Sequence, residues 1–434
     1  MKSAKTAALL AALLAVLLVV NWDDVWINTV VVLTLNRGII SQNCFWWSLN
    51  DMFPDSTGAG LYANLKERGR FVPLNVLGKE IYLVTDLDDI MQLLQGSPNP
   101  FGPGILKKNF FDSFMPNNVG ISVNPEWKLR REYNDSVLEP NKTHTFQAAF
   151  NGSIQEALAT HVPKSFSEFT EFTRRLTSKI VFGTYEYNPV IYRVFKQADS
   201  ILSARFNTHP VDPDDLKEFR AYMRAQLESP EPNTLMSLAF RHHGKIPMDA
   251  VIDQLPHWVF PIAGLFSVHL PRLMVLLANH PKDLAEVVAE IKDQSYMNSE
   301  NYCRKCILEL FRLNNAVNST FRGLTEPFQF KGDATVFQPG TQFVFFNNPI
   351  LRDLFDHPNE FVPSRWTQKL EASHQALMFN HGNQTCPGKE LVITLLTLGL
   401  VNYLQVNDYT VSTPIKLNPS SIPYMLNPCT IVFD

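Results

Sequence analysis

The chain has 434 residues, of which 45% are hydrophobic and 18% charged, and its 38 basic and 42 acidic side chains leave a formal net charge of −4. A chain this long and apolar buries a large core, which excludes a disordered protein and a disulfide-stapled mini-protein. The near-neutral charge argues against a general nucleic-acid-binding protein. Five cysteines, odd in number and scattered, are too few for a disulfide framework, so we expect mostly reduced thiols.

The amino terminus contains an uninterrupted apolar run, Ala7 to Val20, preceded by Lys2 and Lys5. The run is short for a membrane span and resembles the apolar region of a secretory signal, but no convincing cleavage site follows it. We therefore predict a retained membrane anchor within residues 1–40 and a single catalytic domain over residues 41–434.

The orientation of that anchor has two readings. Lysines before the span favour a cytoplasmic amino terminus, which sends a single-pass chain into the lumen. A second apolar stretch, Val25 to Leu35, would return the body to the cytoplasm either as the second arm of a hairpin or by lying in the membrane interface with Trp46 and Trp47. Five Asn-x-Ser/Thr sequences are either glycosylation sites of a secreted protein or chance matches; they begin at Asn134, Asn141, Asn151, Asn318 and Asn383.

Beyond the anchor, the first clear pattern is a β-hairpin. Alternating apolar residues from Phe71 to Val84 flank Gly78, and Asp86 is placed to cap a following helix, Leu87 to Leu94. Residues 96–125 are rich in Pro, Gly and Asn and predict a long functional loop, in which Phe101, Phe110, Phe111 and Phe114 are candidates to line an apolar pocket.

Helical patterns dominate the remainder. They cover residues 127–226, a long apolar stretch from Asp249 to Asn279, residues 299–313 and residues 388–403, with strands predicted over 332–346. The expected fold class is mainly α with small β-sheets. In the long apolar stretch, Pro261 and Pro271 remove helix hydrogen bonds and predict a kink.

One segment near the carboxyl terminus carries a chemical signal. Cys386 lies in a glycine-bearing loop that begins at Phe379 and precedes an apolar helix. A helix N-terminus and the loop N–H groups stabilise a thiolate, Gly388 permits close backbone approach, and Phe379 can pack beside a flat ring. Taken alone, this is a buried cysteine or a metal ligand.

Three further motifs precede or adjoin that loop. Glu309 and Arg312 lie three apart on one helix face, which suits a buried bidentate pair, and Arg365 supplies a third partner. Trp127 and Arg131 lie four apart. Each motif by itself is common on helices, so the information is in their order and spacing.

In that order, the set resembles the cytochrome P450 superfamily of haem-thiolate enzymes, over roughly Phe71 to the carboxyl terminus. The resemblance implies a haem b (iron protoporphyrin IX) between the long helix and the cysteine loop, with Cys386 as the axial thiolate that binds the iron. It also implies that Glu309, Arg312 and Arg365 form a structural triad, and that the haem propionates are held by Trp127, Arg131 and Arg322.

The sequence departs from the family pattern in the loop and in the long helix. Asn380 replaces a usual glycine, and Gln384 stands where Arg or His is common. The usual acid–alcohol pair of the long helix is also missing: aligned on Ala263-Gly264 it becomes Phe266 and Ser267, and counted back from His280-Pro281 it becomes Gly264 and Leu265.

The resulting hypothesis is a monooxygenase that inserts one oxygen atom of dioxygen into a lipophilic small molecule, with Ala263, Gly264 and Ser267 at the catalytic face. The electrons would come from a separate flavoprotein reductase, because no flavin or nicotinamide fingerprint occurs in the chain. The missing acid keeps a hydroperoxide or endoperoxide isomerase and a peroxide-driven oxygenase open, as well as a non-catalytic haem-binding protein. Since an iron-ligating thiol must stay reduced, we expect an endoplasmic-reticulum-like membrane location with the body facing the cytoplasm.

Overall fold

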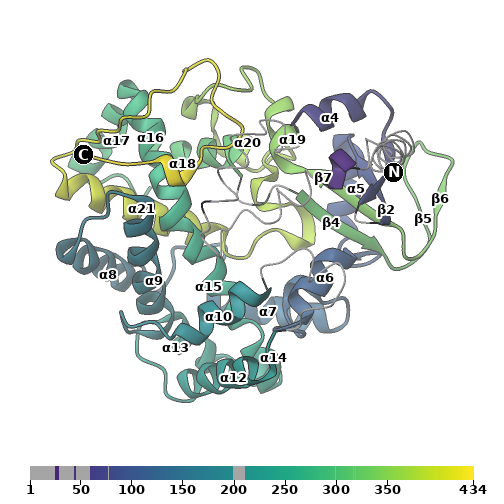
Figure 1. Ribbon diagram of the computed structural model, residues 1–434, viewed down its shortest axis with the longest axis horizontal. Helices are drawn as coiled ribbons and strands as arrows, with labels where there is room; N and C mark the ends of the chain where they lie inside the picture. The colour runs from purple at the N-terminus through teal and green to yellow at the C-terminus, as the bar shows by residue number, and fades with distance from the viewer. Residues whose placement is uncertain are drawn as a thin grey trace, which may run out of the picture.

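A computed structural model describes residues 25–28, 44, 59–76, 78–198, 211–298, 300–315, 317 and 319–434. Within this part of the chain, helices make up most of the molecule, and the strands gather at one end of it (Figure 1). The predicted fold class, mainly α with small sheets, is confirmed.

The larger sheet joins segments that are far apart in the chain. Its strand order is β1-β2-β7-β4-β3, and only the β2–β7 pair is parallel. The strands are β1 (Phe71–Val76), β2 (Lys79–Val84), β3 (Phe101–Pro103), β4 (Ser319–Leu324) and β7 (Gln342–Phe346). A second sheet pairs β5 (Phe328–Gln329) with β6 (Val336–Phe337). The predicted β1–β2 hairpin is present and turns at Gly78, whose φ of +73° favours glycine.

The helices of the first part of the chain run from α4 to α13. They are α4 (Ala59–Lys66), α5 (Leu87–Gln95), α6 (Ile105–Asp112), α7 (Glu126–Leu138), α8 (Gln147–Thr160), α9 (Phe166–Phe182), α10 (Pro189–Ala198), α12 (Pro213–Glu228) and α13 (Leu235–Arg241). The predicted cap of α5 is present, because the Asp86 side chain accepts from the N–H groups of Asp88 and Asp89. The expectation of one continuous loop over residues 96–125 is wrong, because that region contains β3, α6 and a short 3-10 turn. Tertiary contacts with the sheet order it: the Ile105 N–H donates to Gln342 Oε1 at 2.8 Å.

The carboxyl-terminal half supplies the central helices. They are α14 (Met248–Ile252), α15 (Leu255–Gly264), α16 (Leu270–Asn279), α17 (Pro281–Asp293), α18 (Tyr302–Leu313), α19 (Asn347–Asp353), α20 (Gln368–Glu371) and α21 (Lys389–Val406). Between α15 and α16 the chain forms a π-helical turn, Leu265–His269. The predicted irregularity is therefore present, and it has a covalent cause: Pro271 has no N–H to donate to the Ser267 carbonyl four residues earlier.

Two helical stretches of the described residues are long and apolar enough to cross a membrane, Met248–Asn279 and Lys389–Val406. However, 89% and 78% of their most apolar windows are buried within the protein, which identifies them as core helices. The predicted anchor, residues 1–40, lies outside the described residues except for residues 25–28.

The segments before α4 are tied to the folded body at two points. Ile27 is buried in the hydrophobic core and Trp26 packs against it. Cys44 forms a disulfide with Cys429, across a sequence separation of 385 and with a Cα–Cα distance of 5.8 Å. The expectation of reduced thiols is therefore wrong for this pair, because two cysteines near opposite ends of the chain meet only after folding.

Candidate functional site

The loop that carries Cys386 is closed by backbone hydrogen bonds. The Cys386 N–H donates to the Phe379 carbonyl at 2.8 Å, and the Lys389 N–H donates to the Cys386 carbonyl at 3.3 Å. Gly382 has a φ of +68°, and a Cβ there would approach the Leu94 carbonyl of α5 to 2.8 Å. Only glycine allows this contact between the loop and α5.

Asn380 occupies a strained conformation in the same loop. Its φ of +59° and ψ of −173° lie in a region that almost exclusively glycine adopts. The replacement of glycine noted in the sequence therefore has a conformational consequence, and the loop holds the strain in place.

Cys386 is a free thiol, half-buried in this loop. Burial raises its pKa, while a hydrogen bond from the Gly388 N–H and the nearby charges of Arg131 and Lys389 act in the opposite direction. A Cβ at Gly388 would meet only the Cys386 Sγ, at 3.9 Å, so the space beside the sulfur is open to a bound group.

Phe379 links this loop to the central helices. Its ring packs edge-on against Phe311 of α18 with centroids 5.2 Å apart, and Phe311 packs against His269 of the π-helical turn at 5.1 Å. His269 is buried with no hydrogen-bond partner at Nδ1, and burial together with the charge of Arg272 lowers its pKa to about 3. The ring of His269 is therefore neutral at physiological pH.

Arg131 of α7 reaches the cysteine loop from the side. Its Nη1 donates to the Thr385 carbonyl at 2.6 Å and to the Asn383 carbonyl at 3.3 Å, and its Nε pairs with Asp135 at 2.8 Å. Trp127 lies half-buried one turn earlier on the same helix. The structure thus brings Arg131 directly to the loop that holds Cys386.

Arg322 lies on β4 and is buried. Its Nε donates to the Ser97 Oγ at 2.9 Å, and Ser97 follows α5, the helix against which Gly382 of the cysteine loop packs. Desolvation lowers the Arg322 pKa to about 10. The chain of contacts from the loop through α5 to Ser97 places this arginine beside the same region.

Two cationic or titratable side chains that sequence reasoning missed lie close to Arg322. Lys107 of α6 has its pKa lowered to about 7 by burial and by the Arg322 charge, and His257 of α15 has its pKa lowered to about 4 by burial and by the Lys107 charge. A Cβ on Gly120 would lie 3.3 Å from both Lys107 Nζ and His257 Cε1. None of the ion pairs among the described residues involves Lys107 or Arg322, so within this part of the chain neither cation is paired with a carboxylate.

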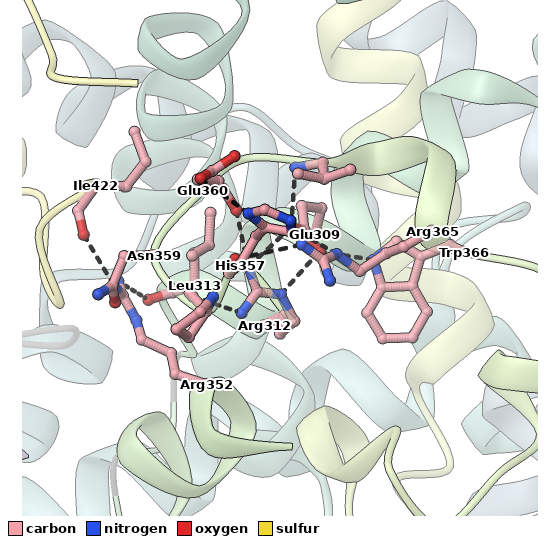
Figure 2. A network of polar contacts seen from close by, with 12 residues as sticks. Glu309, Arg312, Leu313, Arg352, His357, Asn359, Glu360, Arg365, Trp366 and Ile422 are labelled. Carbon is pink, nitrogen blue, oxygen red and sulfur yellow. Dashed lines mark hydrogen bonds and ion pairs between the residues drawn. The ribbon is translucent and has the colours of Figure 1, made fainter. Parts of the chain in front are cut away.

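The other charged cluster is complete. Glu309 accepts from Arg312 Nε and Nη2 at 2.9 and 2.8 Å, from the Trp366 Nε1 at 2.9 Å and from the Val362 N–H at 3.0 Å (Figure 2). Arg365 Nε pairs with the same carboxylate at 3.2 Å. Arg312 also donates to the Pro358 and Glu360 carbonyls. The predicted set of Glu309, Arg312 and Arg365 therefore meets at one point, with every oxygen of the buried carboxylate bonded.

The long helix contributes no acid near the π-helical turn. Ser267 is buried and donates to the Ala263 carbonyl at 2.8 Å. Phe266 faces α21, where a Cβ on Gly399 would meet its Cε1 at 2.7 Å. Gly264 and Leu265 are also buried. Since residues 255–279 contain no Asp or Glu, neither register supplies an acid–alcohol pair.

These features fit a haem with two carboxylates. Cys386 offers a thiolate ligand beside the open space at Gly388. Lys107 and Arg322, which form no ion pair with another described residue, offer partners for anionic groups. A single cysteine thiolate is one of the protein ligands that hold haem iron, so the sulfur of Cys386 is a suitable donor.

Comparisons with known proteins agree with this geometry. The family model described as Cytochrome P450 matches residues 270–423. Cytochrome P450 85A1 of Solanum lycopersicum is 29% identical over 164 residues, and the match covers 34% of this chain and 34% of that protein. Probable cytochrome P450 CYP44 of Caenorhabditis elegans is 31% identical over 118 residues, covering 26% of this chain and 24% of that protein. The chain thus matches only about a third or less of the length of these curated relatives.

Solved structures cover far more of the chain. A cytochrome P450 (CYP102L1) aligns with a TM-score of 0.65 and 15% identity, covering 84% of this chain and 94% of that one. P450BioI, in complex with hexadec-9Z-enoic acid ligated acyl carrier protein, aligns with a TM-score of 0.64 and 14% identity, covering 83% and 94%. The fold is therefore the cytochrome P450 fold. The family model and the relatives show that about a third of the chain is similar to the cytochrome P450 superfamily, whose members hold haem through a cysteine thiolate.

Proposed function

We propose that the chain is a haem-thiolate oxygenase in which Cys386 binds the iron of haem b. The observation that carries the proposal is a free, half-buried thiol held in a closed loop at the start of α21. Buried Arg322 and half-buried Lys107, which have no carboxylate partner among the described residues, support it, because a haem brings two carboxylates.

When bound through a thiolate, haem supplies the chemistry that cleaves an O–O bond. The residues of the chain hold and orient it. Arg131, Trp127 and Arg322 bind the propionates. This chain has Gln384 where superfamily members commonly have an arginine or a histidine that contacts a propionate. Lys107 supplies part of that contact. Glu309, Arg312 and Arg365 fix the segments that flank the cysteine loop, and Phe379 packs between the loop and α18.

The substrate is a lipophilic small molecule. Phenylalanines of α6, α10 and α15 and of the loop after α6 form one aromatic cluster, with ring centroids between 4.5 and 6.4 Å apart: Phe110, Phe111, Phe114, Phe195 and Phe260. Phe101 is not part of it, since its ring packs among Phe328, Phe330 and Phe343 of the sheet region.

The proposed reaction is monooxygenation, with dioxygen as the oxidant and electrons from a separate flavoprotein reductase. The proposed membrane anchor is the part of residues 1–40 that precedes Val25, because Ile27 is buried in the core of the body. Ala263, Gly264 and Ser267 lie in the segment of the long helix that would face the reacting oxygen. Ser267 can pass a proton only if its hydroxyl leaves the Ala263 carbonyl.

A second candidate is favoured by the same helix. Residues 255–279 contain no carboxylate, so the chain has no acid there to deliver protons to bound dioxygen. A substrate that already contains an O–O bond, such as a lipid hydroperoxide or endoperoxide, needs no such delivery, and neither does oxygenation driven by hydrogen peroxide.

Carbon monoxide binding to the reduced protein tests the haem-thiolate assignment. The wild-type chain should give a thiolate-type Soret band, and Cys386→Ser should lose it while Cys306→Ser retains it. A Soret band that Cys386→Ser leaves unchanged contradicts the proposal. A thiolate-type band without turnover under any oxidant would identify a non-catalytic haem-binding protein.

The oxygen source is tested by supplying three oxidants to the same preparation: reductase with NADPH, hydrogen peroxide, and a lipid hydroperoxide alone. Turnover with the reductase supports monooxygenation. Turnover only with the hydroperoxide contradicts it and supports the second candidate. Ser267→Ala should raise the number of electrons consumed per product if Ser267 delivers protons, and should leave hydroperoxide turnover unchanged.

A further inference from the structure

We propose that the folded body lies in an oxidising, glycosylating compartment and carries an N-linked glycan on Asn141. The first observation is the Cys44–Cys429 disulfide. Disulfides persist in the lumen of the endoplasmic reticulum and outside the cell, and are rare in the cytosol. The cytoplasm-facing body expected from the cysteine content is thereby replaced by a lumenal one.

The second observation concerns the two possible anchors. With a cytoplasmic amino terminus, a cytoplasmic body would need the stretch from Val25 to Leu35 to cross or enter the membrane as a second apolar segment. Ile27, however, is buried in the core of the body, and Trp26 packs against that core. Residues packed in the core of the body, as Trp26 and Ile27 are, cannot also lie in the bilayer. The single-pass reading remains, and with Lys2 and Lys5 on the cytoplasmic side it directs the body into the lumen.

The third observation is how the structure separates the glycosylation sequences. Asn134 is buried: its Nδ2 donates to the Arg130 carbonyl and to Gln254 Oε1, and its Oδ1 accepts from the Trp258 Nε1. Asn151 is half-buried in α8, where its Oδ1 accepts from the Asn402 Nδ2 at 2.8 Å. Neither amide can carry a sugar in the folded protein.

Two other sequences are less suitable or undescribed. Asn383 is exposed, but it lies in the cysteine loop, where its carbonyl accepts from Arg131 and its Nδ2 approaches the Gln95 carbonyl at 3.5 Å. A sugar there would sit against the contact between the loop and α5. Asn318 lies outside the described residues.

Asn141 differs from all of these. Asn141, Lys142 and Thr143 are each exposed, and none of the hydrogen bonds among the described residues uses the Asn141 amide. The turn that presents them is held from below by Glu139: its carboxylate pairs with Lys142 at 2.8 Å and accepts from the Thr145 hydroxyl at 2.7 Å. The acceptor asparagine is thus displayed on an ordered turn without a role in packing.

The modification is a group transfer. The Asn141 Nδ2 forms a C–N bond with the anomeric carbon of an oligosaccharide donated by a polyprenyl diphosphate. The bond between that carbon and the diphosphate oxygen breaks, the lipid diphosphate leaves, and one amide proton is released. Asn141 also lines a surface groove of about 550 Å³ with Arg304, Glu371 and Lys389.

The test expresses the full chain in a eukaryotic cell and compares electrophoretic mobility before and after treatment with an N-glycosidase. The wild-type chain should lose the shift of one glycan, and Thr143→Ala should show none. Thr143→Ser keeps the acceptor sequence and is the matched control, so it should behave as the wild type. An unchanged shift in Thr143→Ala, or no shift in the wild type, overturns the proposal.

A second measurement keeps the compartment testable apart from the glycan. Thiol alkylation of the denatured, unreduced protein should label three cysteines, and reduction should add two, located by mass spectrometry at Cys44 and Cys429. Five labelled cysteines without reduction overturn the oxidising compartment. The carbon monoxide spectrum of the same preparation reports on the haem-thiolate site separately, so failure of one conclusion does not imply failure of the other.

Discussion

Two charged regions of this protein, one around buried Glu309 and one around buried Arg322, differ in whether the described residues supply the opposite charge. Around Glu309, two arginines, an indole N–H and a backbone N–H satisfy one carboxylate, and all partners come from the chain itself (Figure 2). Around Arg322, the side chains of Lys107 and His257 add further positive or titratable groups, with no carboxylate paired to either cation among the described residues. The first region is complete without any added group, while the second fits an anionic group that the described residues do not supply.

The presence or absence of an opposite charge affects both the pKa values of the buried groups and the stability of the folded protein. Burying a charge without a partner disfavours the charged form, which is why the pKa values of Lys107 and Arg322 are lowered. A buried charge with all its bonds formed is instead very sensitive to the loss of one partner. Breaking the two regions should therefore have opposite signatures: large loss of stability at the first, and pH-dependent, ligand-dependent stability at the second.

The largest effect is expected at the complete region. Glu309→Gln leaves Arg312 and Arg365 without a counter-charge in a buried site and should reduce the free energy of unfolding by about 3–5 kcal/mol. The matched control is Glu360→Gln, whose side chain is 37% exposed and, among the described residues, pairs only with exposed His357, so stability should change by less than about 0.5 kcal/mol. Urea unfolding followed by circular dichroism measures both. Equal midpoints for the two variants would show that the buried network contributes little.

The incomplete region should respond to pH and to haem. In the haem-free protein the folded state binds the Lys107 proton less tightly than the unfolded state does, so stability should rise with pH from about 7 toward the ordinary lysine pKa of 10.5. The slope should reach at most about 1.4 kcal/mol per pH unit. Lys107→Met should flatten it, whereas Lys108→Met, at an exposed position, should not.

Haem should have the same flattening effect as Lys107→Met, because a propionate carboxylate beside Lys107 raises its pKa in the folded state. Unfolding midpoints at several pH values, with and without haem, measure this. A slope that haem leaves unchanged would mean that Lys107 does not contact the cofactor.

A smaller effect is expected at His269, the buried neutral histidine of the π-helical turn. The pKa of His269 is lowered to about 3, so below the ordinary value of 6.5 the unfolded state gains a proton that the folded state does not. Stability should fall with decreasing pH, by about 2 kcal/mol at pH 5 relative to neutral pH. His269→Leu should remove much of this acid sensitivity, and exposed His161→Leu should not. Parallel acid-unfolding curves for the two variants would contradict the assignment.

The smallest expected change is a gain in stability in the cysteine loop. Asn380→Gly relieves a side chain held at φ +59° and ψ −173° and should stabilise the folded protein by about 1 kcal/mol. Asn383→Gly, at a residue without positive φ, should instead be neutral or destabilising. Thermal unfolding of the haem-loaded protein compares them. A lower melting temperature for Asn380→Gly would show that the Asn380 side chain contributes more than its strain costs.

Local sequence signals predicted the elements that depend on nearby residues. The Asp86 cap, the hairpin turn at Gly78 and the irregularity near Pro271 each follow from the chemistry of one or two side chains. Likewise, the spacing of Glu309 and Arg312 along one helix fixes their mutual contact. The region around α6 was not predicted, because its order comes from contacts such as that of Ile105 with Gln342, which is 237 residues away.

The sequence by itself thus determined the fold class, the identity of the thiol in the loop, the buried acid–arginine pair and the lack of an acid in the long helix. Only the tertiary structure decided that Lys107 lies near Arg322 with no carboxylate paired to either among the described residues, that Cys44 meets Cys429, and that Asn141 is exposed where Asn134 is buried. The reason is physical. Periodicity, capping and covalent constraints act over a few residues, whereas pairing, desolvation and exposure depend on what distant segments bring to the same place.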